Sequence, residues 1–172
     1  MTDDTRVSAL ASLHSSGLLA YFTRRVHQRD DAADLLGETL LVLWRRARDV
    51  PSDDDAARLW LYGVARKVLA THRRTGTRRH ALATRLRTEL AAHDDQQPAE
   101  DPRLTTLQQA LDELDPQDQE IIKLVHWDGF SLTDAAQIMG KRPGTVRSRY
   151  HRARARLRAH LDIPEAVQER CL

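Results

Sequence analysis

The sequence is poor in the residues that build disulfide frameworks and aromatic cores. Its 172 residues include one cysteine and two phenylalanines. A single thiol excludes an internal disulfide framework and fits a reducing compartment. No apolar run approaches the roughly 20 residues that span a membrane, and no basic segment followed by an apolar run marks a signal peptide at the start. We therefore expect a cytoplasmic chain without membrane insertion.

Signatures of catalysis and of metal binding are also missing. None of the eight histidines belongs to an HExxH pattern, and the one thiol, Cys171, lies beside the C-terminus. The sequence contains neither a glycine-rich phosphate loop after a strand nor a nucleophile elbow. No β-rich alternating run appears. These observations predict an all-α protein that is not an enzyme and has no cofactor and no metal site.

Charge is distributed unevenly along the chain, although the net charge is only +2. Residues 59–93 contain eight Lys or Arg and one acid, whereas residues 94–120 contain nine acids and one Arg. Residues 121–172 contain ten basic residues and five acids. Two basic regions flanking an acidic connector suggest two contacts with nucleic acid.

A helix-turn-helix is predicted from residue 131 to residue 161. Ser131 is a good N-cap for a first short helix, and Gly140 suits the left-handed position that ends it. Pro143 blocks continuation of that helix and favours a turn before a second one. A helix-turn-helix places its second helix in the major groove of DNA.

The second helix of this motif has an apolar stripe and a basic surface. The apolar residues recur three and four positions apart and predict a core-facing stripe: Val146, Tyr150, Ala153, Leu157 and Leu161. The other faces carry six arginines and a histidine: Arg147, Arg149, Arg152, Arg154, Arg156, Arg158 and His151. Arginines in this density favour the phosphate backbone and can read guanine edges.

The rest of the chain predicts two small helical domains, at 13–76 and 104–161, joined by a flexible linker at 77–103. In the first domain, helices are expected near 18–26, 32–48 and 56–74. The apolar positions of the helix at 32–48 include Leu35 and Trp44, and Thr75–Gly76–Thr77 is expected to break the helix at 56–74. In the second, helices near 104–114 and 116–127 precede the helix-turn-helix. Within the linker, the polar segment 93–102 cannot form a core.

The C-terminal half of the third helix is a second candidate DNA site. Its residues mix charge with hydrogen-bonding groups: Arg66, Lys67, Thr71, His72, Arg73 and Arg74. The alternative is a solvated helix end whose positive charge complements the helix dipole. Trp60 and Tyr62 lie nearby and could stack on unpaired bases, although Trp60 at such a position is more often a core residue.

Three segments resemble the extracytoplasmic-function group of bacterial RNA polymerase sigma factors. Residues 144–154, GTVRSRYHRAR, are similar to the region 4 motif G-T-V-K/R-S-R-L-H-R-A-R. Residues 31–40, DAADLLGETL, resemble the region 2 motif D-A-E-D-L-V-Q-E-T-F. Residues 60–67 resemble the A-W-L…I-A-R-N segment. The resemblance covers roughly residues 14–161 and both domains in the family's order.

This resemblance implies a subunit that binds core RNA polymerase and directs transcription initiation at promoters. Region 2 would bind the clamp helices of the largest subunit through Asp34, Leu35, Glu38 and Leu41, and the −10 element through the six residues of the third helix. Region 4 would contact the −35 element, with Arg142 and Thr145 on phosphates and Arg149 on either a base or a phosphate. The full set is Arg142, Thr145, Arg147, Ser148, Arg149, His151 and Arg152. The flap of the second largest subunit and an anti-sigma factor are further implied partners.

Several positions depart from the family pattern. Gly37 stands where glutamine is usual, in the middle of a helix, where glycine costs about 1 kcal/mol relative to alanine. Lys67 replaces asparagine and Thr71 replaces an acidic residue in the −10 segment. Two other functions stay open at this point: a stand-alone helix-turn-helix regulator, and a protein whose arginine-rich helix binds an acidic partner. A regulator has no need of residues 31–74.

Overall fold

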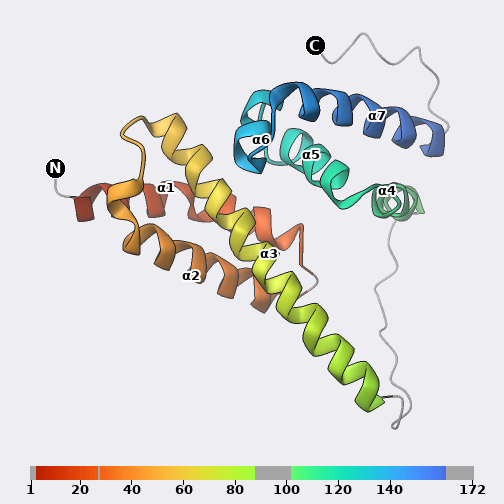
Figure 1. Ribbon diagram of the computed structural model, residues 1–172, viewed down its shortest axis with the longest axis horizontal. Helices are drawn as coiled ribbons and strands as arrows, with labels where there is room; N and C mark the ends of the chain where they lie inside the picture. The colour runs from red at the N-terminus through yellow and green to blue at the C-terminus, as the bar shows by residue number, and fades with distance from the viewer. Residues whose placement is uncertain (1–2, 27, 88–101, 162–172) are drawn as a thin grey trace. The chain divides into compact units, whose positions relative to one another are not determined.

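The computed structural model describes residues 3–26, 28–87 and 102–161 (Figure 1). Within these ranges the regular structure is entirely helical, which confirms the expected all-α class. The chain divides into two compact units. The first contains α1, α2, η1 and α3, and the second contains α4, α5, α7 and most of α6. Most of the predicted linker, at 88–101, lies outside the described residues.

The first helix, α1 (Asp3–Thr23), begins well before the expected start near residue 18. Val7 and Leu10 are buried together with Leu18 and Phe22 further along the helix. The Arg6 guanidinium donates to the carbonyl of Pro51 and, at 3.5 Å, to that of Val50. Polar serines and His14 interrupt the apolar pattern of this segment, so its periodicity alone gave a weak signal.

The second helix, α2 (Arg29–Arg45), separates a core face from an exposed face. Its buried residues recur three and four positions apart: Ala32, Leu35, Thr39 and Leu43. Thr39 satisfies its buried hydroxyl by donating to the carbonyl of Leu35 at 2.8 Å. The helix ends at Arg45, and the turn η1 (Ala47–Asp49) follows, so the expected end near Arg48 was three residues late.

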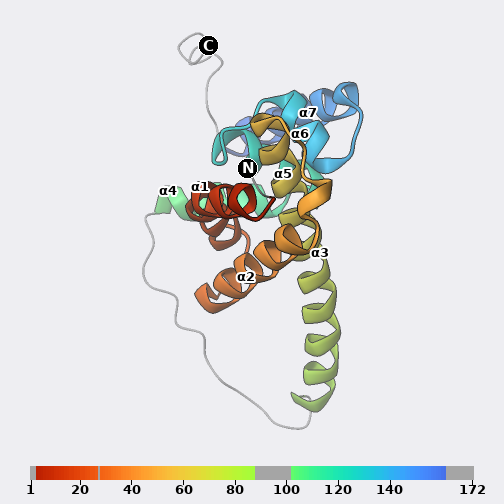
Figure 2. The same cartoon turned by 90° about the vertical axis from the view of Figure 1, so that its left-hand side faces the viewer.

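The third helix, α3 (Asp54–Arg87), begins two residues before the expected start near 56, and the side chain of Asp53 accepts from the backbone N–H of Ala56 at 2.8 Å. The expected break at Thr75–Gly76–Thr77 is wrong, since the helix continues through it. One helical glycine costs only about 1 kcal/mol, and Thr75 turns its hydroxyl onto the helix by donating to the carbonyl of Thr71 at 3.1 Å. Figures 1 and 2 show the C-terminal part of α3 extending past α1 and α2.

Aromatic rings form the centre of the first unit. Tyr21 is fully buried, and its ring meets those of Phe22 and Tyr62 edge to face at centroid distances of 5.3 and 5.6 Å. The Arg25 guanidinium covers the Tyr21 ring at 3.7 Å. Tyr62 is therefore a core residue and not an exposed stacking platform, whereas Trp60 is only partly buried.

The second unit contains α4 (Pro102–Asp112), α5 (Pro116–His126), α6 (Leu132–Met139) and α7 (Pro143–Leu161). Asp115 caps α5 by accepting from the Gln117 N–H at 2.9 Å, and Pro116 occupies the first turn, where its missing N–H costs nothing. Ile121 and Leu124 of α5 and Val146 of α7 are fully buried. The core of this unit thus forms where α5 and α7 pack together.

The N-terminus of α6 and the turn that ends it have the predicted chemistry. The Ser131 hydroxyl accepts from the Asp134 N–H at 3.1 Å, and the Asp134 carboxylate accepts from the Ser131 N–H at 3.0 Å. Gly140 has a φ of 61°, and the Lys141 N–H donates to the Ala136 carbonyl at 2.9 Å, which closes the end of α6. The helix-turn-helix expected from the sequence is confirmed.

We predict that Gly140→Ala destabilises the second unit by about 1–2 kcal/mol, because a Cβ is strained at positive φ. Urea unfolding would be followed by Trp127 fluorescence in a background where Trp44 and Trp60 are phenylalanine. The matched control is Gly144→Ala on the next helix, where φ is ordinary and an added Cβ meets nothing within 4 Å. Equal effects of the two substitutions would contradict the strain argument.

Gly37→Ala should stabilise the first unit, in contrast to the destabilisation expected from Gly140→Ala. Gly37 lies inside α2 and an added Cβ meets nothing within 4 Å, so alanine gains helix propensity of about 1 kcal/mol without a clash. Gly17→Ala is the comparison within the same unit, because its Cβ would lie 2.7 Å from the Tyr62 hydroxyl. Thermal unfolding should show a higher Tm for Gly37→Ala and a lower one for Gly17→Ala.

Candidate nucleic-acid interface

One face of α7 is packed and the opposite face is exposed. Val146, Tyr150 and Ala153 are buried, whereas four of the five side chains between them are exposed: Arg147, Ser148, His151 and Arg152. Six of the seven residues expected at the −35 element are exposed and form what we call the recognition face: Arg142, Thr145, Arg147, Ser148, His151 and Arg152. The structure therefore brings these six together on one surface of the helix-turn-helix.

Arg149, the seventh residue, lies elsewhere. Its Nε donates to Asp118 Oδ1 at 2.7 Å, and its Nη2 donates to Asp115 Oδ1 at 2.6 Å. Its side chain is 25% exposed. Position 149 belongs to the series 146, 149, 150 and 153, which is the spacing of the buried face of a helix. That spacing was the signal that could have separated Arg149 from its neighbours.

The residues expected at the −10 element do not all share one surface. Lys67, Thr71 and Arg74 are exposed at positions i, i+4 and i+7 of α3, and Arg74 Nη2 donates to the Thr71 hydroxyl at 3.3 Å. We call these three the α3 face. They define a polar strip on one side of the helix.

The other three −10 candidates are arranged differently. His72 Nε2 lies 3.7 Å from Asp31 Oδ2 at the start of α2, and Arg73 donates to the backbone carbonyl of Arg25 at 3.3 Å. Arg66 is partly buried. His72 and Arg73 therefore tie α3 to the rest of the first unit.

The exposed face of α2 carries three of the four residues expected to bind polymerase. Asp34, Glu38 and Leu41 are exposed at i, i+4 and i+7, and Leu41 is 55% exposed. We call them the α2 face. Leu35, the fourth, is 1% exposed and belongs to the core. Trp44, expected among the apolar core positions, is 45% exposed beside Leu41, one turn along the helix.

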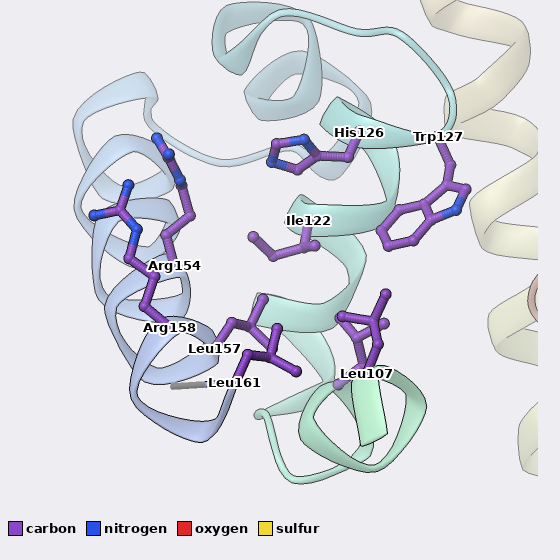
Figure 3. Close-up of a pocket in the computed structure, with 9 residues that line it drawn as sticks. Leu107, Ile122, His126, Trp127, Arg154, Leu157, Arg158 and Leu161 are labelled. Atoms are coloured by element: carbon purple, nitrogen blue, oxygen red, sulfur yellow. The ribbon is translucent and has the colours of Figure 1, made fainter. Parts of the chain in front are cut away.

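An apolar groove of about 280 Å³ lies in the second unit between α4, α5 and α7. Figure 3 shows Leu107, Ile122, Leu157 and Leu161 gathered around it, with Trp127 on one side and two arginines on the other. Leu157 and Leu161, expected in the buried stripe of α7, are only partly buried because they line this groove. Sequence reasoning did not foresee the groove.

His126 lies at one end of the groove against α7. Its Nε2 and the Tyr150 hydroxyl share a hydrogen bond of 3.1 Å, and the two rings stack with centroids 5.8 Å apart. Burial lowers the pKa of the His126 imidazole below its usual 6.5, and the positive charge of Arg154 lowers this pKa further. The neutral imidazole is thus favoured, and the positive charge at the groove comes from Arg154 and Arg158.

Metal-ligating side chains do not assemble within residues 3–26, 28–87 and 102–161, where no group of three or more His, Cys, Asp or Glu is placed to hold an ion. Across the helices that the structure describes, none has the length and apolar character needed to cross a membrane.

Comparisons with known proteins match both units in order. The family model for sigma-70 region 2 matches residues 10–79, and the model for sigma-70 region 4 matches residues 104–157. The extracytoplasmic-function (ECF) RNA polymerase sigma factor SigL of Mycobacterium tuberculosis is 30% identical over 156 residues, which cover 89% of this chain and 87% of SigL. The ECF sigma factor EcfG of Rhodopseudomonas palustris is 34% identical over 171 residues, 96% of this chain and 90% of EcfG.

Solved structures show the same fold. The sigma factor RpoE of Bartonella quintana, crystallised with the anti-sigma factor NepR, matches with a TM-score of 0.59 at 24% identity over 94% of this chain and 98% of RpoE. CnrH, solved with the cytosolic domain of CnrY, matches with a TM-score of 0.63 at 22% identity over 92% of this chain and 89% of CnrH. A stand-alone regulator does not account for a region 2 match, and the chain belongs to the ECF group of RNA polymerase sigma factors, which direct promoter-specific transcription initiation.

Proposed function

We propose that the recognition face of α7 reads the −35 element in the major groove. The observation that carries this proposal is the exposed arginine-bearing surface on the second helix of a helix-turn-helix, opposite a buried apolar stripe. Arg147 and Arg152 are the base-reading candidates, since arginine can bind the two acceptors of a guanine edge. Arg142 and Thr145 lie at the start of the helix and would contact phosphates.

The α3 face is the proposed −10 contact. Positive charge at a helix C-terminus can simply complement the dipole, but that effect is confined to the last turn. Because α3 continues to Arg87, residues 66–74 lie well inside the helix and this explanation does not apply to them. Lys67 and Arg74 would contact the DNA directly, whereas His72 and Arg73 would hold α3 in place.

The α2 face, with Trp44, is the proposed docking surface for the clamp helices of the largest polymerase subunit. Leu41 and Trp44 are large apolar side chains exposed next to the acidic Asp34 and Glu38. An exposed apolar pair with a charged rim is typical of an interface. Leu35 would support this surface from the core without touching the polymerase.

The groove of the second unit is the proposed site for the flap of the second largest subunit. Its apolar lining fits an amphipathic segment, and Arg154 and Arg158 would favour acidic residues on that segment. RpoE and CnrH were solved with partner proteins, and we propose that an anti-sigma factor likewise binds this chain. We place its activity in the cytoplasm, with polymerase, and assign it binding roles without chemistry of its own.

In vitro transcription with core polymerase on a promoter library tests the whole proposal. We expect transcripts only when this protein is added, from templates that share two short conserved elements. Free protein should bind the same promoters weakly, because each unit offers a small basic surface and only the polymerase couples the two. Tight sequence-specific binding by the free protein would favour a stand-alone regulator.

Arg147→Ala should weaken recognition of the selected −35 sequence by about 1–3 kcal/mol, or roughly five- to 150-fold in transcription, if it reads a guanine. Arg48→Ala is the matched control, because it removes an exposed arginine of η1 outside the four proposed surfaces. Transcription from templates mutated at each −35 position distinguishes a contact to a base from a contact to a phosphate. A base contact loses discrimination at one position, whereas a uniform loss identifies a phosphate contact.

Leu41→Glu should reduce binding to core polymerase by at least about tenfold, because it places a charge in the apolar part of the proposed interface. Leu13→Glu is the control, since Leu13 is an exposed leucine of α1, at 69% exposure, outside the α2 face. A fluorophore on Cys171, the one thiol of the chain, would report binding by anisotropy. Equal losses for the two variants would argue against docking through α2.

A further inference from the structure

Arg149 lies between the recognition helix and the helix that supports it. Its Nε and Nη2 donate to two different carboxylates, those of Asp118 at 2.7 Å and Asp115 at 2.6 Å. Asp115 is the N-cap of α5, and Asp118 belongs to the first turn of that helix. One guanidinium therefore ties two points at the start of α5 to the middle of α7.

The contact between Arg149 and Asp118 matters for stability because the Asp118 carboxylate is buried. The Asp118 side chain is 9% exposed, and its Oδ1 accepts a hydrogen bond from Arg149 Nε. A buried carboxylate that loses its cation is strongly destabilising, because the charge is then neither solvated nor paired. The Asp118 charge therefore holds Arg149 in the interface between α5 and α7.

Asp115 connects the same arginine to the local structure of α5. Its Oδ1 accepts both from Arg149 Nη2 and from the backbone N–H of Gln117, at 2.9 Å. The carboxylate also lies at the N-terminal, positive end of the α5 dipole. The cap of α5 and the position of Arg149 thus depend on the same oxygen atom.

We propose that Arg149 is a positioning residue for −35 recognition and not a base reader. It sets the rotation of α7 against α5 and thereby directs Arg147, His151 and Arg152 outward. Reading a guanine edge needs the arginine fork to be presented to the groove, whereas the Arg149 guanidinium is turned toward the start of α5, where Nε and Nη2 donate to two carboxylates and the side chain is only 25% exposed. This inference rests on the proposed −35 function and assigns it an additional residue.

An apolar pair tests the positioning role directly. Arg149→Met should lower −35-dependent transcription by about tenfold, because Asp118 loses its cation and α7 loses its anchor. Adding Asp118→Leu should restore transcription to within about threefold of wild type, since well-packed apolar residues can replace a buried ion pair. Methionine has no N–H donor, so this rescue is impossible for a residue that reads a base.

Asp118→Asn provides a second, milder measurement. It keeps the side-chain volume and changes no residue of the recognition face, yet it should lower transcription in the same direction as Arg149→Met. Normal transcription by Asp118→Asn, with loss in Arg149→Met, would overturn the proposal. So would a double variant that unfolds at the wild-type temperature but transcribes no better than Arg149→Met. If the double variant unfolds at a lower temperature than wild type, the transcription measured for Asp118→Asn is used to test the positioning role instead.

Arg147→Ala, measured on the same promoters, separates this proposal from the function on which it rests. Loss in Arg147→Ala, without rescue of Arg149→Met in a stable double variant, overturns only the role of Arg149. Full transcription by Arg147→Ala and by Arg149→Met overturns −35 reading by α7 and, with it, the positioning role.

Discussion

The recognition helix cannot pack and bind DNA with the same face, and the second unit is arranged around that constraint. Side chains of a helix leave the axis in fixed directions, so burying Val146, Tyr150 and Ala153 determines which arginines reach solvent. α5 supplies the surface against which this stripe packs. In the proposed function, specificity for DNA is therefore set partly by the apolar residues of the packed face.

Much of the fold could be predicted from the sequence, because its signals were local. Ser131, Gly140 and Pro143 act within a few residues of chain, and the structure shows each in its expected role. Such caps and turns depend little on distant parts of the chain, so a residue pattern suffices to place them.

Most of the wrong predictions concern residues whose burial or partners depend on contacts distant in the sequence, whereas the break expected at Gly76 was a local error. Val7 and Leu10 become part of α1 through burial that their polar neighbours conceal, and Gly76 does not interrupt α3 because a helix tolerates one glycine. Leu35 and Trp44 have nearly equal apolar character, yet one is buried and the other exposed. Helical spacing places Arg149 on the packed face of α7, but its partners are two carboxylates about 30 positions earlier, which no local pattern reveals.

The two carboxylates on Arg149 have a practical consequence for engineering. If Arg149 has the proposed positioning role, a library that randomises every basic position of α7 in search of a new promoter preference would consist mostly of variants with a misplaced helix. Varying positions 147, 148, 151 and 152 while retaining the Asp115–Asp118–Arg149 group keeps the scaffold constant. Differences between selected clones would then report on base preference and not on how well each clone folds.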